Sequence, residues 1–256
     1  MNGVLALLLG RASCPAKGAE KEVVDNGFRY LRGKLGLDSS TKATVIEPTA
    51  AFFPDRYDAS QEAATGLFER VCGYMHIDPA KVVLDFWEEE QGRPLVDAPG
   101  VVGASPNTKG ASGYYQQRDG LDQVSLNMDE LKDPMALVAT IAHELAHVVL
   151  LSHNAMPRVE PHMQAITDLA TIYLGMGIFT ANSLLRQRTW TEGSVQGWSV
   201  SRKGYISPEM AGWALSLFAW SRGEKKPEWA KHLTTDPRSY LKQGLRFIRQ
   251  SAGAPL

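Results

Sequence analysis

The stretch HELAHVVLLSH, residues 143–153, decides the fold because it opens with the pattern His-Glu-x-x-His. On an α-helix, residues four positions apart lie about 40° apart around the axis and one turn along it. His143 and His147 can therefore offer their imidazoles to a single metal ion. Glu144 lies about 100° from His143, beside such an ion. The pattern predicts a zinc site at which Glu144 takes a proton from zinc-bound water.

The sequence around the motif predicts a buried helix. Asp133 can cap it, and Pro134 suits the first helical position. From 135 to about 151 the segment is apolar on nearly every side, which is typical of a helix enclosed by the fold. Two histidines and a glutamate are costly there unless they bind a metal ion or satisfy one another as a hydrogen-bonded cluster. We favour the metal ion.

Two histidines do not complete a catalytic zinc site, so a third ligand is needed. His153 stands where metzincins, with the pattern HExxHxxGxxH, place their third histidine. Leu150 replaces the glycine at which that family turns its chain. On an unbroken helix His153 would lie about 240° from His147 and face away from it. His153 is therefore the least favoured candidate.

The segment MQAITDLATIYLG, residues 163–175, gives a second answer. It resembles the second zinc helix of gluzincins, in which Glu-x-x-x-Asp supplies a zinc-binding glutamate and an aspartate that orients a ligand histidine. The resemblance covers about residues 114–176 and implies a zincin-like metallopeptidase that uses Zn²⁺. Gln164 stands at the glutamate position and Asp168 at the aspartate position. The departure matters, because a neutral amide binds zinc more weakly than a carboxylate.

Further ligand sets stay open at the level of sequence. Asp168 could itself coordinate zinc, as an aspartate does in aspzincins, and either Gln164 or Asp168 could then be the direct ligand. Glu160 or His162, just upstream, could take that place if the helix begins differently. The chain is also similar to an uncharacterised bacterial HExxH family, through FFPD, VCGYM and GMGIFTANS.

The resemblance to zincins also predicts how substrate binds. In that family a strand beside the active-site helix pairs with extended peptide, and QVSLN, residues 123–127, is the expected strand. The residue that stabilises the oxyanion is unassigned, and the candidates are Tyr114, Tyr115, Tyr205 and His162.

Periodicity predicts an α+β fold with a small mixed or antiparallel sheet, a buried active-site helix and a helical C-terminal part. Further helices are expected at 19–35, 60–76 and 163–174, and two more beginning near Ser207 and Asp236. Strands are expected at 41–48 and 82–89 and in a hairpin around Asp119-Gly120, which follows a long loop at 91–113. The region after 180, rich in tryptophan, is expected to be mainly helical. We predict a catalytic part at 1–180 and a helical part at 181–256 packed on it.

Composition narrows the classes of partner and compartment. The chain has 256 residues, 27 Lys and Arg against 28 Asp and Glu, and a net charge of −1, which argues against nucleic acid as a partner. Cys14 and Cys72 form no C-x-x-C pair, which fits a reducing compartment. No stretch reaches the roughly 20 apolar residues of a membrane span. We expect a cytoplasmic protein, with export through the short apolar run 4–9 as the alternative.

Two functional hypotheses follow. The first is a zinc-dependent hydrolase, expected to be a peptidase that acts on peptides or proteins, with Glu144 as general base. The second is a zincin-fold binding or regulatory protein, weakened or inactive because Gln164 replaces the usual glutamate ligand. A partner-binding role for the C-terminal tryptophans is a weaker third, since bulky aromatic side chains are usually core.

Overall fold

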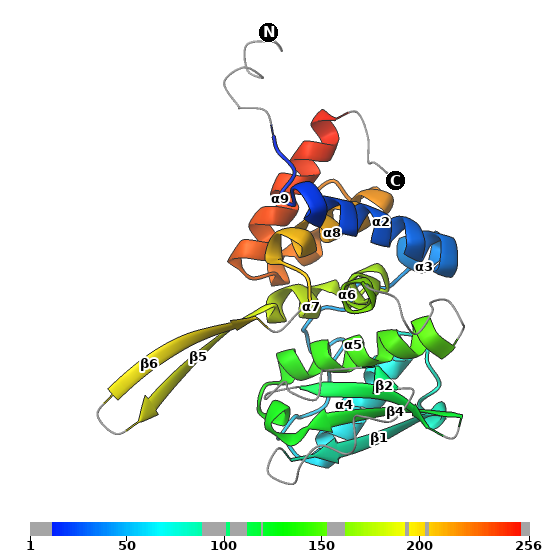
Figure 1. Cartoon of the computed structure of the whole chain (residues 1–256), viewed down its shortest axis with the longest axis vertical. Coiled ribbons are helices and arrows are strands. Elements are labelled where there is room, and N and C mark those ends of the chain that lie inside the picture. The colour runs from blue at the N-terminus through cyan, green and yellow to red at the C-terminus, as the bar shows by residue number, and fades with distance from the viewer. Residues whose placement is uncertain are drawn as a thin grey trace.

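The computed structural model of this chain describes residues 12–88, 101–102, 112–118, 120–152, 162–192, 195–202 and 205–251. It is α+β and mostly helical, as the sequence predicts in outline. A small sheet lies on one side of helix α5 (Pro134–Ser152), and the other helices of the C-terminal half lie on its opposite side (Figure 1). The helix that bears the His-Glu-x-x-His motif is therefore enclosed between two layers.

The elements follow the chain in the order α, β, α, with one late hairpin. The remaining helices are α2 (Gly18–Leu35), α3 (Asp38–Thr41), α4 (Gln61–Tyr74), α6 (Met163–Tyr173), α7 (Gly177–Ser183), α8 (Pro208–Ser221) and α9 (Thr235–Gln250). Short 3₁₀ turns span Pro79–Lys81, Met128–Lys132 and Glu228–His232. The strands are β1 (Val82–Trp87), β2 (Val101–Val102), β3 (Gly113–Arg118), β4 (Leu121–Asn127), β5 (Leu185–Glu192) and β6 (Val195–Arg202).

The main sheet has the order β1-β4-β3-β2. β1 runs parallel to β4, whereas β4 with β3 and β3 with β2 are antiparallel. The predicted hairpin is confirmed: Arg118 pairs with Leu121, and Gly120 takes a φ of 80°. The prediction that QVSLN offers a free strand edge to substrate is wrong, because β4 pairs on both sides, with β1 and with β3.

Helix α5 begins as the sequence predicts and is packed on every side. The Asp133 carboxylate accepts a hydrogen bond from the Ala136 backbone amide at 3.1 Å, and Pro134 is the first helical residue. Leu137, Ile141 and Leu145 are fully buried. The segment Pro134–Leu151 is long and apolar enough to cross a membrane, but 72% of it is buried inside the fold. Length and apolarity are thus weak evidence of a span, since a core helix shares both.

The predicted strand at 41–48 is not formed. Its backbone groups find other partners: the Arg222 guanidinium donates hydrogen bonds to the carbonyl oxygens of Ser40, Thr41 and Ala43. The Ile46 amide donates to the carbonyl oxygen of Gly175. An extended apolar stretch therefore fastens the N-terminal part to α6 and α8 instead of joining a sheet.

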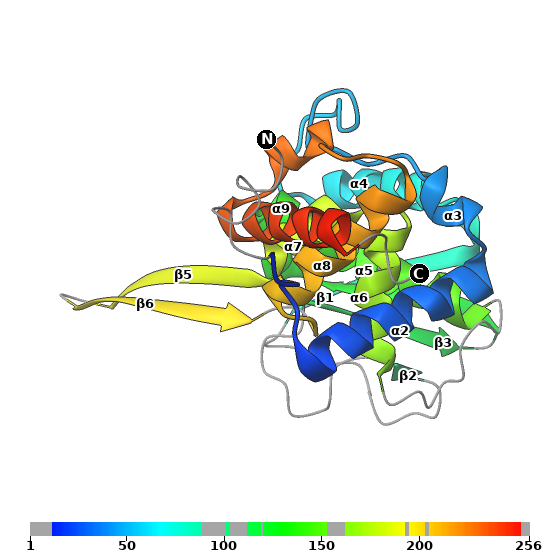
Figure 2. The ribbon, with the colours of Figure 1, turned by 90° about the horizontal axis from the view of Figure 1, so that it is seen from above.

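The expectation of a mainly helical region after 180 is wrong for residues 185–202. β5 and β6 pair antiparallel from Leu185 with Arg202 to Glu192 with Val195. Figures 1 and 2 show this hairpin projecting away from the rest of the chain. Helices α8 and α9 then follow as predicted, with the Ser207 hydroxyl accepting the Met210 amide at the start of α8.

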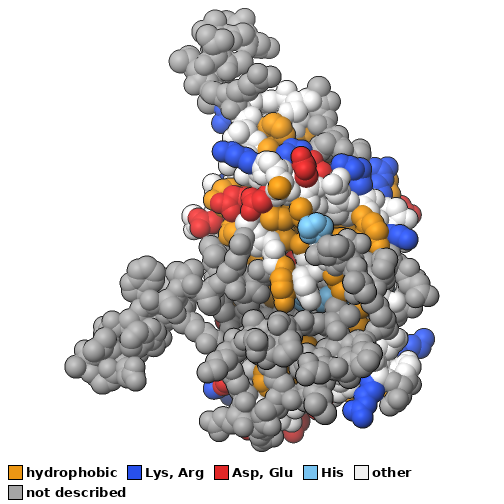
Figure 3. Space-filling model, in the orientation of Figure 1, with side chains coloured by type: hydrophobic (Ala, Val, Ile, Leu, Met, Phe, Trp, Pro, Cys, Tyr) orange, Lys and Arg blue, Asp and Glu red, His pale blue; other side chains and the backbone are white. Residues whose placement is uncertain are grey.

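The helical layer joins both ends of the chain. α8 packs on α9, on α2 and on α6 (Figure 2). The Trp213 indole of α8 donates a 2.7 Å hydrogen bond to Asp25 of α2, and both side chains are buried. On the face seen in Figure 3, Lys, Arg, Asp and Glu side chains of the described residues lie intermixed over this layer. The predicted boundary at residue 180 stays a prediction.

Candidate metal centre

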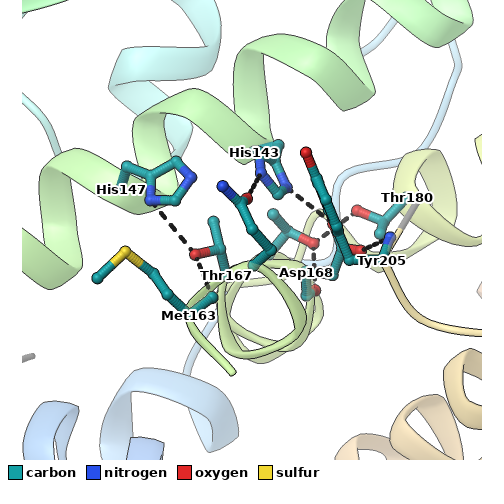
Figure 4. Close-up of polar contacts among 9 residues, drawn as sticks. His143, His147, Met163, Thr167, Asp168, Thr180 and Tyr205 are labelled. Atoms are coloured by element: carbon teal, nitrogen blue, oxygen red, sulfur yellow. Dashed lines mark hydrogen bonds and ion pairs between the residues drawn. The ribbon is translucent and has the colours of Figure 1, made fainter. Parts of the chain in front are cut away.

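The two motif histidines lie side by side on the face of α5 that is turned toward α6 (Figure 4). The ring centroids of His143 and His147 are 5.0 Å apart, and the rings stand at 81° to each other. His147 is 1% exposed, whereas the His143 side chain keeps 15% of its surface in contact with solvent. Histidine side chains are visible near the middle of the face in Figure 3.

Helix α6 supplies a group to each nitrogen of His143. The Gln164 amide oxygen lies 2.9 Å from His143 Nε2, and an oxygen of Asp168 lies 2.8 Å from His143 Nδ1. The second oxygen of Asp168 accepts a 2.8 Å hydrogen bond from the backbone amide of Tyr205. Asp168 thus bonds to Nδ1, the outer nitrogen of His143, while Gln164 faces Nε2, its inner nitrogen. The spacing of four residues on α6 puts both groups on one side of that helix.

Thr167 orients the second histidine. Its hydroxyl donates to the Met163 carbonyl oxygen at 2.8 Å, which leaves the oxygen to accept from His147 Nδ1 at 3.4 Å. Tyr115 of β3 stacks on the opposite side, with ring centroids 5.8 Å apart and 16° between planes. His147 Nε2 is buried and has no hydrogen-bond partner among the described residues. A buried nitrogen in that state is unusual and needs an explanation.

The motif glutamate is enclosed between α5 and β3. Glu144 is 5% exposed, and its Oε2 finds no hydrogen-bond partner in the described part of the chain. A Cβ added at Gly113 of β3 would come within 3.3 Å of Glu144 Cγ and 2.8 Å of Thr140 Cγ2, so any side chain there would force these groups to shift. Burial is the main cause that raises the pKa of Glu144 to about 7, partly offset by His143.

The two histidines titrate in opposite directions. Burial pulls the pKa of His143 down, but the hydrogen bond and charge of Asp168, with smaller contributions from Glu144 and Gln164, raise it to about 9. Burial, followed by the charge of His143, lowers the pKa of His147 well below its ordinary value. His147 is therefore neutral at pH 7 and has a lone pair available, since its Nδ1 carries the proton shared with Thr167.

These donors suit a zinc ion. Two ligands of a tetrahedral zinc ion lie roughly 3.4 Å apart when each bond is about 2.1 Å. His143 Nε2 and Gln164 Oε1 are 2.9 Å apart, so a shift of about half an ångström would admit the ion between them. His147 Nε2 is buried and has no hydrogen-bond partner in the part of the chain that the structure describes. Gln164 is also among the groups that raise the pKa of His147, which puts its amide within reach of both imidazoles.

The remaining candidates separate clearly. His162 is exposed at the start of α6, and Glu160 and His153 lie outside the described residues. Tyr114 is buried on the sheet face away from α5, since Gly113 and Tyr115 face α5 and side chains alternate along a strand. The Tyr205 ring stacks on His143 with centroids 5.6 Å apart.

Some functional contacts were missed at the sequence level. Thr167, Gly113 and the Tyr205 amide carry no motif signal, although Thr167 sits between the two predicted residues of α6. Among the described residues no three His, Cys, Asp or Glu side chains are grouped so as to hold a metal ion. A site at this position therefore depends on the amide oxygen of Gln164. No family model, curated protein or solved structure matches the chain.

Proposed function

We propose that the chain is a zinc-dependent hydrolase of zincin type that cleaves peptides or proteins. The observation that carries the proposal is the convergence of His143 Nε2, Gln164 Oε1 and His147 Nε2 beside the buried Glu144 carboxylate. Among the described residues His147 Nε2 has no hydrogen-bond partner. Helices α5 and α6 supply these groups with the spacing that gluzincins use. The choice of peptides as the substrate class rests on that resemblance.

In this proposal His143, His147 and Gln164 hold the ion, and Asp168 orients His143 through its outer nitrogen. A carboxylate on the outer nitrogen of a ligand histidine fixes its tautomer and raises its basicity. Asp168 is assigned as the orienting group because its oxygens face His143 Nδ1 and the Tyr205 amide, whereas the proposed ligand atom of His143 is Nε2. When bound, zinc would polarise the scissile carbonyl and acidify the attacking water.

The residues around the ion have separate tasks. Glu144 accepts the proton of the attacking water and returns it to the leaving amine, and its pKa of about 7 suits both steps. Tyr205 stacks over His143, and burial together with the charges of Glu144 and Asp168 raises its pKa. Tyr205 thus keeps its proton and can donate a hydrogen bond to the oxyanion.

The test separates metal binding from chemistry. Protein purified without chelator should contain one zinc per chain, and His147→Ala should lose it. His162→Ala, at the exposed start of α6, is the matched control and should keep it. Glu144→Gln should keep zinc but lower cleavage of a peptide library by at least about a hundredfold. Glu69→Gln, at an exposed position of α4, should leave the rate of cleavage unchanged. Full hydrolysis by Glu144→Gln would reject Glu144 as the base.

A second candidate is a zinc-containing binding or regulatory protein. The observation in its favour is that the third donor is a neutral amide, so the site lacks the anionic ligand of a His₂Glu centre. One zinc per chain with no cleavage would favour this candidate. Gln164→Glu should then raise zinc affinity and produce peptidase activity. If Gln164→Glu leaves both unchanged, Gln164 does not face the metal.

A further inference from the structure

A cavity lies away from the candidate metal centre. It has a volume of about 480 Å³ and is enclosed by the loop 48–57, α4, the first turns of α5 and α7. Phe53, Leu67, Val138 and Phe179 give it an apolar interior. Pockets for small ligands usually have volumes of about 300–1,000 Å³ and a mainly apolar lining with a few polar groups.

Helix α5 itself separates this cavity from the histidines. Successive helical residues are about 100° apart, so Val138 lies about 140° around the axis from His143 and about 180° from His147. Pro134 and Met135 also line the cavity. Pro134 lies about 180° around the axis from His143, and Met135 lies about 80° from it but about 12 Å nearer the start of the helix. A ligand in the cavity would therefore meet the first turns of α5, at a distance along the helix from Glu144 and both imidazoles.

Hydrogen bonds, an ion pair and an aromatic contact hold the wall of the cavity in place without a ligand. Asp55 of the loop forms an ion pair with Arg70 of α4. The Tyr57 hydroxyl donates to the Leu131 carbonyl oxygen at 2.7 Å, and the Tyr74 hydroxyl donates to the Phe52 carbonyl oxygen. Phe53 packs edge-on against Phe179 with ring centroids 5.5 Å apart. A preformed pocket binds with a smaller ordering cost than one that must be assembled.

The rim offers one charge of each sign. Arg56 and Glu62 both line the cavity and both are exposed. Arg56 acts on the neighbouring Asp58 only through its charge, without a hydrogen bond. The other two charged lining residues, Asp55 and Arg70, neutralise each other. A ligand with a single charge would be attracted to one of the two rim groups and repelled by the other. A ligand with both an ammonium and a carboxylate would match both.

We propose that this cavity binds a short apolar peptide with free ends, such as a dipeptide of large apolar residues. Its side chains would fill the space between Phe53, Leu67, Val138 and Phe179, its carboxylate would pair with Arg56, and its ammonium with Glu62. This binding goes beyond the proposed hydrolase function and does not require it, because no residue of the metal centre lines the cavity.

The experiment uses the dipeptide Leu-Phe as probe and the full-length Glu144→Gln protein, in which the probe is not consumed. Calorimetric titration in the presence of EDTA should give one site per chain. Arg56→Gln and Glu62→Gln should each weaken binding by about fivefold. Ala63→Phe, which adds bulk to the α4 wall, should abolish binding. Arg29→Gln, at an exposed arginine of α2, is the matched control and should change nothing.

Three results would overturn the proposal. The first is no heat with about 5 mM probe while the protein is folded by circular dichroism. The second is equal binding of N-acetyl-Leu-Phe-amide, which lacks both charges and would show that the ends are not recognised. The third is binding that requires zinc and His147 but tolerates Ala63→Phe, which would place the peptide at the metal centre. Absence of zinc or of hydrolysis would leave these titrations unaffected.

Discussion

At the scale of single residues, His143 links the candidate site to the stability of the metal-free protein. Its folded pKa of about 9 exceeds the usual value of about 6.5, so the folded state holds the proton more tightly than the unfolded chain. The stabilisation is complete below pH 6.5 and is lost as the pH rises through 9. In EDTA, the free energy of unfolding should fall by up to about 3 kcal/mol between pH 6.5 and 9.5.

The partner of His143 provides the control for this pH dependence. The Asp168 carboxylate stabilises the protonated form of His143. Asp168→Asn should therefore reduce the fall in the free energy of unfolding with pH, measured by urea unfolding at both pH values. Glu144, with its pKa of about 7, contributes mainly below this window, and His147 acts in the opposite sense below pH 6.5. Parallel pH profiles for wild type and Asp168→Asn would contradict the assignment of this ion pair.

The Thr167 hydroxyl sets which nitrogen of His147 is free to bind a metal ion. Its hydroxyl proton is committed to the Met163 carbonyl oxygen, so its oxygen accepts from His147 Nδ1 and leaves the lone pair on Nε2. Thr167→Val keeps the shape but removes the acceptor, and should weaken zinc binding by about tenfold. Thr167→Ser retains the hydroxyl and should bind as wild type. Competition against a chromophoric chelator measures the zinc affinity of each variant. Equal affinities of Thr167→Val and Thr167→Ser would show that the Thr167 hydroxyl does not contribute to zinc binding.

At the scale of elements, the contact of β3 with α5 depends on one missing side chain. Gly113→Ala would force a methyl group to within 2.8 Å of Thr140 Cγ2 and 3.3 Å of Glu144 Cγ. We expect a loss of about 1–3 kcal/mol in the free energy of unfolding, as overpacking typically costs. Thr140→Ser removes the nearer clashing carbon, so the double variant Gly113→Ala with Thr140→Ser should recover part of that loss. Additive losses would mean that this contact is not the obstacle.

The elements that could be predicted from sequence are those set by local signals. α5 has an N-terminal cap at Asp133, and α5 and α6 both have periodicity and polar residues at helical spacing. The sequence therefore predicts both helices and places the two histidines, Gln164 and Asp168 on them. The stretch 41–48 has strand periodicity, but partners far along the chain, Arg222 and Gly175, satisfy its backbone. Pairing partners of strands are likewise distant, and so the sequence could not reveal that β4 is an inner strand.

At the scale of the whole molecule, the buried pair of Trp213 and Asp25 tests whether the two ends of the chain fold as one unit. The Trp213 indole of α8 donates a hydrogen bond of 2.7 Å to the Asp25 carboxylate of α2, which also forms an ion pair with Lys21. Trp213→Phe removes a hydrogen bond to a charged group inside the core and leaves a small void. We expect a loss of about 2–4 kcal/mol. Trp220→Phe, at a half-buried position of the same helix, should cost less.

The way in which this loss of stability is spread over the helices shows whether the chain unfolds as one cooperative unit or as two. α2 and α9 lie near opposite ends of the chain, yet both pack on α8. If the molecule unfolds cooperatively, slowly exchanging amides of α2, α5 and α9 should lose protection by the same free energy in Trp213→Phe, measured by native-state hydrogen exchange. Loss confined to α8 and α9 would instead divide the chain near residue 180. The candidate metal centre would then belong to a part that is stable without the C-terminal helices.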